Sequence, residues 1–272
     1  MKKIAVIPNN TKDVNYEYTK KICDFLAGKA EIIMHKKHEN TGIDANFTED
    51  VYLNADAVIV LGGDGTMLQA AEPCGKRGIP VMGINLGKIG FMTEVETVDM
   101  ESACMRLLED EYEVEQRMMM EIEVCGKNNF IALNDAVIAK TDARMISMEM
   151  YASEEKISEY IADGLIVSTP TGSTGYSLSA GGPVADPEME LFIATPICAH
   201  MLSARPMLVS EDKVLKLCLT QTGGDKASLT IDGEEKCVVK AGDTVFVRKS
   251  EHKLKIIKLG RQSFYYTMMA KL

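Results

Sequence analysis

The sequence predicts an α/β domain followed by a β-rich domain. Three observations support this fold class: a length of 272 residues, alternating strand-like and helix-like segments up to about residue 110, and short alternating segments after it. A chain of this length can form one large or two ordinary hydrophobic cores. The first pattern predicts a parallel sheet covered by helices, and the second predicts antiparallel strands.

Apolar runs place the strands of the first domain, and the spacing of apolar residues places its helices. The expected strands are residues 3–8, 30–34, 56–61 and 79–84. The expected helices are residues 14–27, 66–74 and 98–108. Apolar side chains three and four residues apart share one face of a helix, as Ile22, Phe25 and Leu26 do. Because ligands bind at the carboxyl ends of parallel strands, we expect a site after one of these strands.

Short segments that alternate apolar and polar residues mark the second domain. Examples are residues 121–124, 147–150, 216–219 and 244–247. Turn residues such as Asp232-Gly233 separate such segments, which is typical of antiparallel strands. We place the α/β domain at residues 1–115 and the β-rich domain at residues 116–257. Whether a tail of about residues 258–272 packs back on the first domain is left open.

The composition is that of an ordinary globular protein, with 46% hydrophobic and 26% charged residues. A net charge of −10 argues against a non-specific nucleic-acid binder, which needs a basic face. No stretch approaches the roughly 20 apolar residues of a membrane-spanning helix. The seven cysteines are odd in number and lack C-x-x-C spacing, which favours reduced thiols. We therefore expect a cytoplasmic protein with no nucleic-acid or membrane partner.

The glycine-rich turn at residues 62–66, with the sequence Gly-Gly-Asp-Gly-Thr, is the strongest chemical signal. It follows a buried strand and precedes a helix in the predicted order. Glycines let backbone N–H groups approach a phosphate closely. The carboxylate of Asp64 among them suits a proton acceptor or a charge linked to a metal ion, which points to phosphoryl transfer. Read alone, an Asp-Gly pair more often marks a turn.

Two further segments carry polar residues next to predicted strands. Asn134-Asp135 is bounded by apolar residues at the start of a strand. Residues 162–183 are rich in hydroxyls and glycines, and offer many small donors with little bulk, as a polyhydroxy or phosphorylated ligand requires. Each segment alone reads equally well as a strand cap or a solvated loop. The conjunction of both with the glycine-rich turn favours a ligand site.

Taken together, these motifs resemble those of the bacterial NAD kinase family. The residues that carry the resemblance are Gly62-Gly63-Asp64-Gly65-Thr66, Gly83-Ile84-Asn85-Leu86-Gly87-x-x-Gly90-Phe91, Asn134-Asp135, Asp163-Gly164-x-x-x-Ser168-Thr169-x-Thr171-Gly172-Ser173-Thr174-x-Tyr176 and Thr195-Pro196-x-x-x-His200. The resemblance runs in order from Lys3 to about residue 270. The sequence departs from the family pattern at Gly175, where alanine is usual, and at Gln69, where many members have a basic residue.

The resemblance implies a Rossmann-like or phosphofructokinase-like α/β domain and a β-rich, NAD-binding domain of β-sandwich type. It implies that the γ-phosphoryl of ATP, or of polyphosphate, is transferred to the 2′-hydroxyl of the adenosine ribose of NAD to give NADP. Magnesium is the implied metal ion and is carried by ATP, with no protein ligand assigned. NAD and ATP are the implied partners, and the family is usually a homo-oligomer, either a dimer or a tetramer.

The resemblance also assigns roles to residues of this sequence. Asp64 is implied to be the catalytic proton acceptor, and the phosphate loop is Gly62, Gly63, Gly65 and Thr66. The residues implied to bind NAD are Asp64, Gly65, Asn134, Asp135, Asp163, Thr171, Thr174, Tyr176, Ser177 and Ser179. Of these, Asn134 and Asp135 are assigned to the adenine and ribose, and Asp163 to the nicotinamide side.

Two alternatives share part of this pattern. Diacylglycerol and other lipid-type kinases have the glycine-aspartate turn, although they favour a basic or apolar membrane-facing surface that the composition does not indicate. A nucleotide-binding regulator without catalysis is the second alternative, and the presence of Asp64 argues against it.

Overall fold

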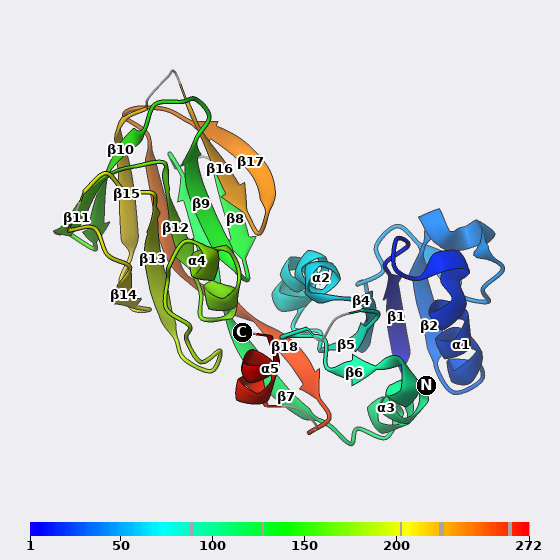
Figure 1. The fold of residues 1–272 in the computed structure, drawn as a ribbon. Helices are drawn as coiled ribbons and strands as arrows, with labels where there is room; N and C mark the ends of the chain where they lie inside the picture. The colour runs from blue at the N-terminus through cyan, green and yellow to red at the C-terminus, as the bar shows by residue number, and fades with distance from the viewer. Residues whose placement is uncertain (88–89, 127, 202, 223–225, 261–262, 272) are drawn as a thin grey trace. The chain divides into compact units, whose positions relative to one another are not determined.

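The structure is a computed structural model that describes residues 1–272 apart from 88–89, 127, 202, 223–225, 261–262 and 272. The chain forms two compact units (Figure 1). Unit 1 contains Met1–Gln116 and Lys253–Leu272, and unit 2 contains Arg117–His252. The tail considered in the sequence prediction includes residues 261–262 and 272, which lie outside the described residues.

Unit 1 is an α/β layer structure built on a parallel sheet. Its elements are β1 (Lys3–Pro8), η1 (Val14–Tyr16), α1 (Glu17–Leu26), β2 (Glu31–His35), η2 (Lys36–Thr41), β3 (Asn46–Thr48), β4 (Ala57–Gly62), α2 (Asp64–Arg77), β5 (Val81–Asn85), β6 (Val95–Glu96), η3 (Thr97–Asp99), α3 (Met100–Leu108) and α5 (Phe264–Lys271). The strand order is β3-β2-β1-β4-β5, with parallel pairing throughout. β6 and the end of β18 (Thr244–Lys258) both pair in parallel with β5.

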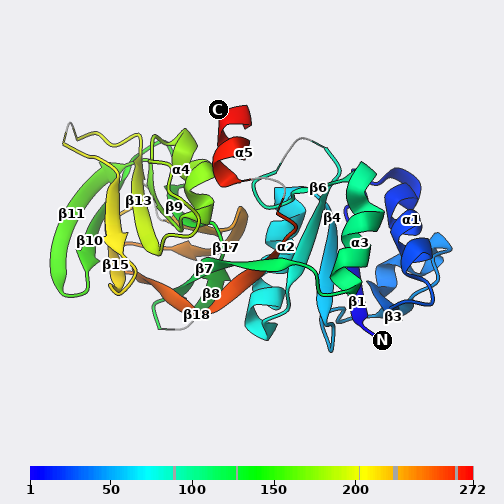
Figure 2. The same cartoon turned by 90° about the horizontal axis from the view of Figure 1, so that it is seen from below.

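Successive side chains of the sheet point to its two opposite faces, and helices cover each face, as Figure 2 shows. Ile59 and Leu61 of β4 belong to the buried cluster that α1 and α3 complete. Val58 and Val60 point to the other face because successive residues of a strand alternate. α2 packs on that face, where a Cβ at Gly83 would lie 2.8 Å from the Met67 Cε. The parallel sheet therefore presents its carboxyl edge at the turn between β4 and α2.

The observed elements lie close to the predicted ones, with one difference that matters for the site. β1 spans the predicted residues, whereas α2 begins at Asp64 instead of residue 66. Gly63 precedes the helix in an extended conformation, so the carboxylate occupies the first helical turn. The helix ends at Arg77 and is capped by Gly78, whose φ of +65° suits glycine.

Unit 2 is an antiparallel β structure with two sheets. Its elements are β7 (Glu113–Val124), β8 (Asn128–Ala132), β9 (Asp135–Lys140), β10 (Ile146–Ala152), β11 (Glu155–Ala162), β12 (Gly164–Ser168), η4 (Thr171–Thr174), α4 (Tyr176–Ser179), β13 (Leu191–Ile197), β14 (Met207–Ser210), β15 (Leu215–Gln221), β16 (Ala227–Ile231), β17 (Glu234–Val239) and β18. One sheet has the order β11-β10-β15-β18, with β7 paired to β18 and β8 paired to β7. The other has the order β14-β13-β12-β9-β16-β17.

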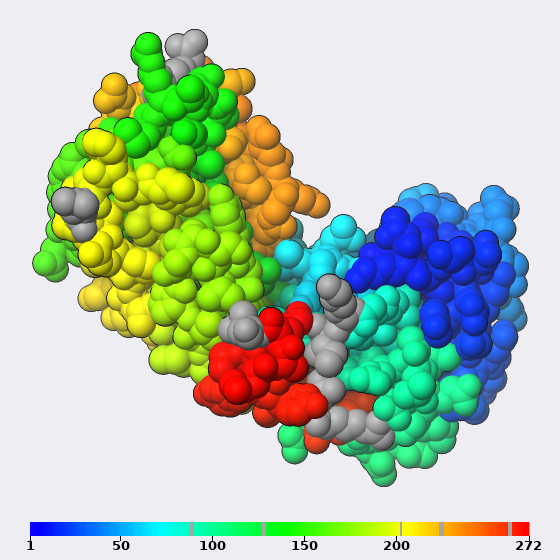
Figure 3. Space-filling model, in the orientation of Figure 1, coloured from blue at the N-terminus to red at the C-terminus, as the bar shows by residue number. Residues whose placement is uncertain are grey.

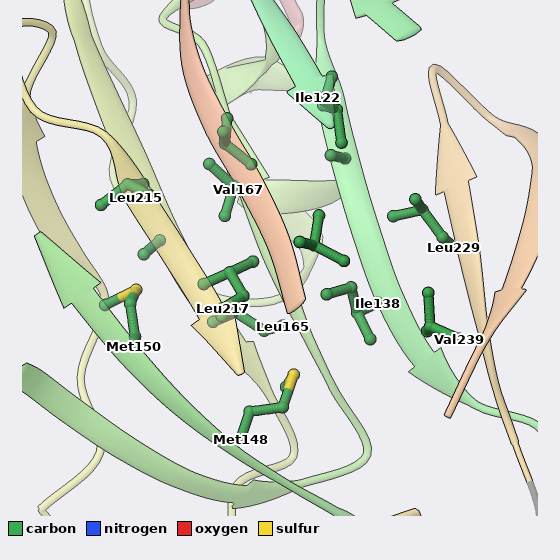
Figure 4. Close-up of a cluster of buried hydrophobic side chains, with 14 of the residues drawn as sticks. Ile122, Ile138, Met148, Met150, Leu165, Val167, Leu215, Leu217, Leu229 and Val239 are labelled. Carbon is green, nitrogen blue, oxygen red and sulfur yellow. The ribbon is translucent and has the colours of Figure 1, made fainter. Parts of the chain in front are cut away.

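Apolar side chains from both sheets form the core of unit 2 (Figure 4). The cluster includes Ile138, Met148, Met150, Leu165, Val167, Leu215, Leu217 and Leu229. Along β10 and β15 these positions alternate with less buried ones, as two packed sheets require. The predicted fold class, an α/β domain with a parallel sheet followed by a β-rich domain of β-sandwich type, is confirmed.

Among the described residues, no helix is both long enough and apolar enough to cross a membrane. All seven cysteines are free thiols. Burial raises the pKa of the Cys23, Cys74 and Cys104 thiols to about 12, so these three stay protonated at neutral pH.

Candidate functional site

Asp64 lies at the carboxyl edge of the parallel sheet of unit 1, where β4 meets α2. Its carboxylate accepts hydrogen bonds from the backbone N–H of Phe91 (2.8 Å to Oδ2) and of Met92 (3.0 Å to Oδ1). The Thr93 hydroxyl lies 3.4 Å from Oδ1, and the Lys271 Nζ lies 3.9 Å from Oδ2. These donors orient the carboxylate, and a side-chain exposure of 30% leaves it open to a ligand.

The glycines around Asp64 are required by close approaches. A Cβ at Gly62 would lie 2.3 Å from the Thr66 Oγ1, and a Cβ at Gly90 would lie 2.3 Å from the Asp64 Oδ1. Both contacts are far shorter than side chains tolerate. At Gly65, which is exposed, a Cβ would meet no atom within 4 Å. The backbone at Gly65 therefore faces open space that a phosphate or sugar could occupy.

A pocket of about 400 Å³ opens at the ends of β5 and β6. It is lined by Lys12, Tyr18, Asn85, Leu86, Gly87, Glu96 and Thr97. The pocket adjoins the glycine-rich turn, because Gly62 pairs with Asn85 and its carbonyl accepts a 2.7 Å hydrogen bond from the Leu86 N–H. The Lys12 ammonium lies 2.7 Å from the position of a Cβ on Gly63. An anion beside this turn would thus meet helix N–H groups and a lysine.

Thr66 is fixed within this turn. Its Oγ1 accepts a 2.8 Å hydrogen bond from the Asn9 Nδ2, and the residue is buried. Within the described residues, no group of three or more His, Cys, Asp or Glu side chains is placed to hold a metal ion.

In unit 2, Asn134 and Asp135 are held by a third polar residue, Asp232. The Asp232 carboxylate accepts hydrogen bonds from the backbone N–H groups of Leu133 (2.8 Å), Asn134 (2.8 Å) and Asp135 (3.0 Å). Asp232 and Gly233 form the two-residue loop between β16 and β17, with φ values of +49° and +83°. Both values suit an Asp-Gly hairpin turn. The sequence indicated only the turn, and the role of Asp232 as an anchor for β9 was missed.

Asp135 is buried, with 7% of its surface exposed. Burial, and to a lesser extent the neighbouring Asp232 carboxylate, raises the pKa of Asp135 to about 7. The Oδ1 of Asn134 is also buried, and no hydrogen-bond partner for it lies in the described part of the chain. Buried polar atoms normally have partners, so this oxygen is suited to receive a donor from a ligand.

The hydroxyl-rich segment packs directly on Asn134. The Thr169 N–H donates to the Asn134 carbonyl over 2.9 Å, and a Cβ at Gly172 would lie 2.2 Å from that carbonyl oxygen. A Cβ at Gly175 would lie 4.0 Å from the Asp135 Oδ2. Antiparallel pairing of Ser168 with Asp135 explains why two segments distant in sequence meet here. The structure thus brings together two of the three predicted motifs.

The predicted residues of η4 and α4 differ in their exposure. Tyr176 and Ser179 are exposed, and Thr174 is half-buried with its hydroxyl 3.4 Å from the Thr171 carbonyl. Thr171 is buried and its hydroxyl lies 3.4 Å from the Nη1 of the buried Arg117. The buried Ser177 hydroxyl lies 2.9 Å from the Thr195 Oγ1.

Asp163 stands apart from this group. It precedes β12, and Asn134 lies at the other end of the paired strands, because Gly164 pairs with Ala139 and Ser168 with Asp135. Six residues of extended strand span about 20 Å. The Asp163 Oδ1 lies 2.6 Å from the Lys140 Nζ, and both side chains are about one-third exposed. The structure does not bring Asp163 together with Asn134 and Asp135.

Comparison with known proteins identifies the family. The model of the ATP-NAD kinase N-terminal domain matches residues 17–112, and that of the ATP-NAD kinase C-terminal domain matches residues 133–259. An NAD kinase of Acetivibrio thermocellus is 36% identical over 281 residues, covering 100% of this chain and 97% of its own length. An NAD kinase of Carboxydothermus hydrogenoformans is 42% identical over 222 residues, covering 80% of this chain and 79% of its own.

Solved structures agree with this. The crystal structure of an NAD kinase from Archaeoglobus fulgidus in complex with ATP has a TM-score of 0.76 and 26% identity, covering 95% of this chain and 94% of its own. Yeast NADH kinase complexed with NADH has a TM-score of 0.91 over 100% of this chain and 87% of its own, and at 20% identity it supports the fold. The family predicted from the sequence is confirmed: this chain belongs to the ATP-NAD kinase family.

Proposed function

We propose that this chain is an NAD kinase that transfers the γ-phosphoryl of ATP to the 2′-hydroxyl of the adenosine ribose of NAD, giving NADP. The observation that carries this proposal is the Asp64 carboxylate, oriented by two backbone N–H groups and open to solvent at the start of α2. The kinases of A. fulgidus and yeast, solved with ATP and with NADH, support the two substrate classes.

Asp64 is the proton acceptor in this proposal. A ribose hydroxyl is a very weak acid, so its proton passes to the Asp64 carboxylate as the bond between O2′ and the γ-phosphorus forms. The bond between the γ-phosphorus and the bridging oxygen breaks in the same displacement, and ADP leaves with that electron pair. The carboxylate also orients the hydroxyl for in-line attack.

The glycine-rich turn binds the donor phosphates in this proposal. Gly62, Gly63, Gly65 and Thr66 lie around the N-terminus of α2, where the helix dipole favours an anion. Lys12 beside Gly63 adds a positive charge. Magnesium belongs to the donor substrate, MgATP, whose phosphate charge it neutralises. Polyphosphate in place of ATP stays a prediction.

Unit 2 is the NAD-binding domain in this proposal, with Asn134 and Asp135 holding the adenine and ribose. The Asn134 Oδ1, which has no hydrogen-bond partner among the described residues, and the exposed Tyr176 support this. Asp163 lies about 20 Å along β12 from Asn134 and Asp135. This separation favours a role in which Asp163 contacts the nicotinamide side of an NAD molecule that a second copy of the chain binds. We accordingly propose a homo-oligomer, a dimer or a tetramer, and a cytoplasmic location.

The test is a coupled assay on the full chain. Incubation with ATP, Mg²⁺ and NAD should give NADP, which an NADP-specific dehydrogenase detects. Phosphorylation of diacylglycerol vesicles without NADP formation would favour the lipid kinase alternative. Binding of NAD by calorimetry without any turnover would favour the regulator.

A further inference from the structure

α5 carries a lysine to the carboxylate that accepts the proton. The Lys271 Nζ lies 3.9 Å from the Asp64 Oδ2 and 4.4 Å from the centre of the Phe91 ring. The Phe91 and Phe264 rings pack with centroids 5.7 Å apart. Phe91 therefore has three contacts at this point: its N–H holds Asp64, and its ring meets both ends of α5. The atoms of α5, in red, lie at the surface in Figure 3.

This geometry leaves the ammonium group available. A distance of 3.9 Å exceeds that of a direct N–H···O hydrogen bond. Asp64 and Lys271 are 30% and 31% exposed, and in the described part of the chain the ammonium contacts only this carboxylate and this ring. An ion pair of this kind contributes little to stability. A contribution to the stability of the fold therefore does not explain the position of Lys271 well.

Charge supplies a better explanation. Phosphoryl transfer brings an anionic phosphoryl group close to the Asp64 carboxylate, and the two negative charges repel each other. The chain as a whole carries a net charge of −10, so its long-range field adds to this repulsion. A lysine provides a compact positive charge with three donors for phosphate oxygens. Lys271 stands where such a charge would offset the repulsion.

We propose that Lys271 is a catalytic residue that binds the phosphoryl group in transit beside Asp64. This rests on the proposed NAD kinase function for its substrate, and on the ion pair with Asp64 for its position. In this arrangement the ammonium moves from the carboxylate to the phosphate oxygens as the donor binds. No bond to Lys271 forms or breaks, and its proton stays on the nitrogen.

The test compares three variants of the full chain. Lys271→Met keeps an unbranched side chain over Phe91 and removes the charge, so kcat should fall by roughly 10²-fold, as for loss of one preorganised donor. The affinity for NAD and the unfolding temperature should stay near wild type. Lys271→Arg should recover most of the activity. Lys21→Met is the matched control, because Lys21 also pairs with a carboxylate, Glu17, and lies over the Tyr18 ring.

A second measurement separates this proposal from the proposed function. Binding of inorganic pyrophosphate, followed by calorimetry, needs no turnover and should weaken by roughly 10-fold in Lys271→Met. Equal pyrophosphate affinity of wild type and Lys271→Met overturns the role of Lys271. So does a kcat within two-fold of wild type, or a loss confined to NAD affinity. A wild-type protein that forms no NADP but binds pyrophosphate through Lys271 would overturn the proposed function alone.

Discussion

Asp64 in unit 1 and Asp135 in unit 2 are two carboxylates in opposite surroundings. The Asp64 carboxylate accepts hydrogen bonds from two backbone N–H groups, lies near Lys271 and is 30% exposed. Asp135 is 7% exposed, and this burial, together with the neighbouring Asp232 carboxylate, raises its pKa to about 7. Burial and a second carboxylate both favour the neutral form of an acid such as Asp135.

In the proposed function, the two units have different tasks, and the two carboxylates differ accordingly. A proton acceptor must be oriented and reachable, and the surroundings of Asp64 provide both. In the proposed function Asp135 binds the ribose, and its burial leaves sugar hydroxyls to take the place of water as its hydrogen-bond donors.

Asp64→Asn should lower kcat by about 10²–10⁴-fold, the range for a lost general base. The amide cannot accept the proton, and its NH2 group replaces the oxygen that accepts from one of the two N–H groups, that of Phe91 or that of Met92. The affinity for NAD should change little, because the role of Asp64 is realised during transfer. Steady-state kinetics together with NAD calorimetry measure both quantities.

Asp50→Asn is the matched control for this variant. The Asp50 carboxylate also accepts a backbone N–H, from Tyr52, and pairs with a cation, Arg77. This variant should keep the wild-type kcat. A full kcat in Asp64→Asn, or an equal loss in Asp50→Asn, would contradict the assignment of Asp64 as proton acceptor.

Asp135→Asn should stabilise the protein at pH 8 and change it little near pH 4. A pKa raised from 3.8 to about 7 means that the folded state holds a proton that the unfolded chain releases. The contribution of Asp135 to stability is therefore present below pH 4 and is lost as pH rises through 7. At 1.36 kcal/mol per unit, the loss is at most about 4 kcal/mol, and the variant should recover part of it.

Calorimetric unfolding at several pH values measures this effect. Asp142→Asn is the control, since Asp142 is exposed on the same unit and should change stability little at any pH. A stability difference between Asp135→Asn and wild type that is the same at pH 4 and pH 8 would disprove the argument. Such a result would mean that contacts of the charged Asp135 carboxylate in the wild-type protein compensate for its burial.

Much of this arrangement could be predicted from the sequence. The strand β1 and the position of the glycine-rich turn followed from an apolar run and three closely spaced glycines, both of which are local signals. The match of Asn134-Asp135 and the hydroxyl-rich segment to one family followed from motif order. These features need no knowledge of which distant segments meet.

The residues that sequence reasoning missed depend on such meetings. Asp232 accepts hydrogen bonds from the N–H groups of three residues that precede it by 97 to 99 positions, whereas its Asp-Gly sequence indicates only a hairpin. Lys271 reaches Asp64 from α5, whose sequence Phe-Tyr-Tyr-Thr-Met-Met-Ala-Lys shows no clear apolar stripe. Neither residue has a local signal that distinguishes it from an ordinary turn or tail residue.

Gly172→Ala should have the smallest of the three effects, a destabilisation of about 1–3 kcal/mol as for other overpacked sites. The new Cβ would lie 2.2 Å from the carbonyl oxygen of Asn134 and 2.6 Å from its carbonyl carbon, and backbone cannot move aside cheaply. The shift should displace Asn134 and weaken NAD binding as well. Thermal unfolding, with an expected decrease of about 3–9 °C, and NAD calorimetry measure the two consequences.

Gly175→Ala is the matched control, three residues further along the same segment. Its Cβ would lie 3.3 Å from the Gly172 carbonyl oxygen and 4.0 Å from the Asp135 Oδ2, and its φ of −97° is accessible to alanine. A few tenths of an ångström of adjustment suffice, and the lower entropy of the unfolded chain offsets that cost, so stability should stay within about 1 kcal/mol of wild type. The opposite result for Gly172→Ala would be unfolding at the wild-type temperature and normal binding of NAD. That result would contradict the argument that close packing of the hydroxyl-rich segment positions Asn134 and the buried Asp135.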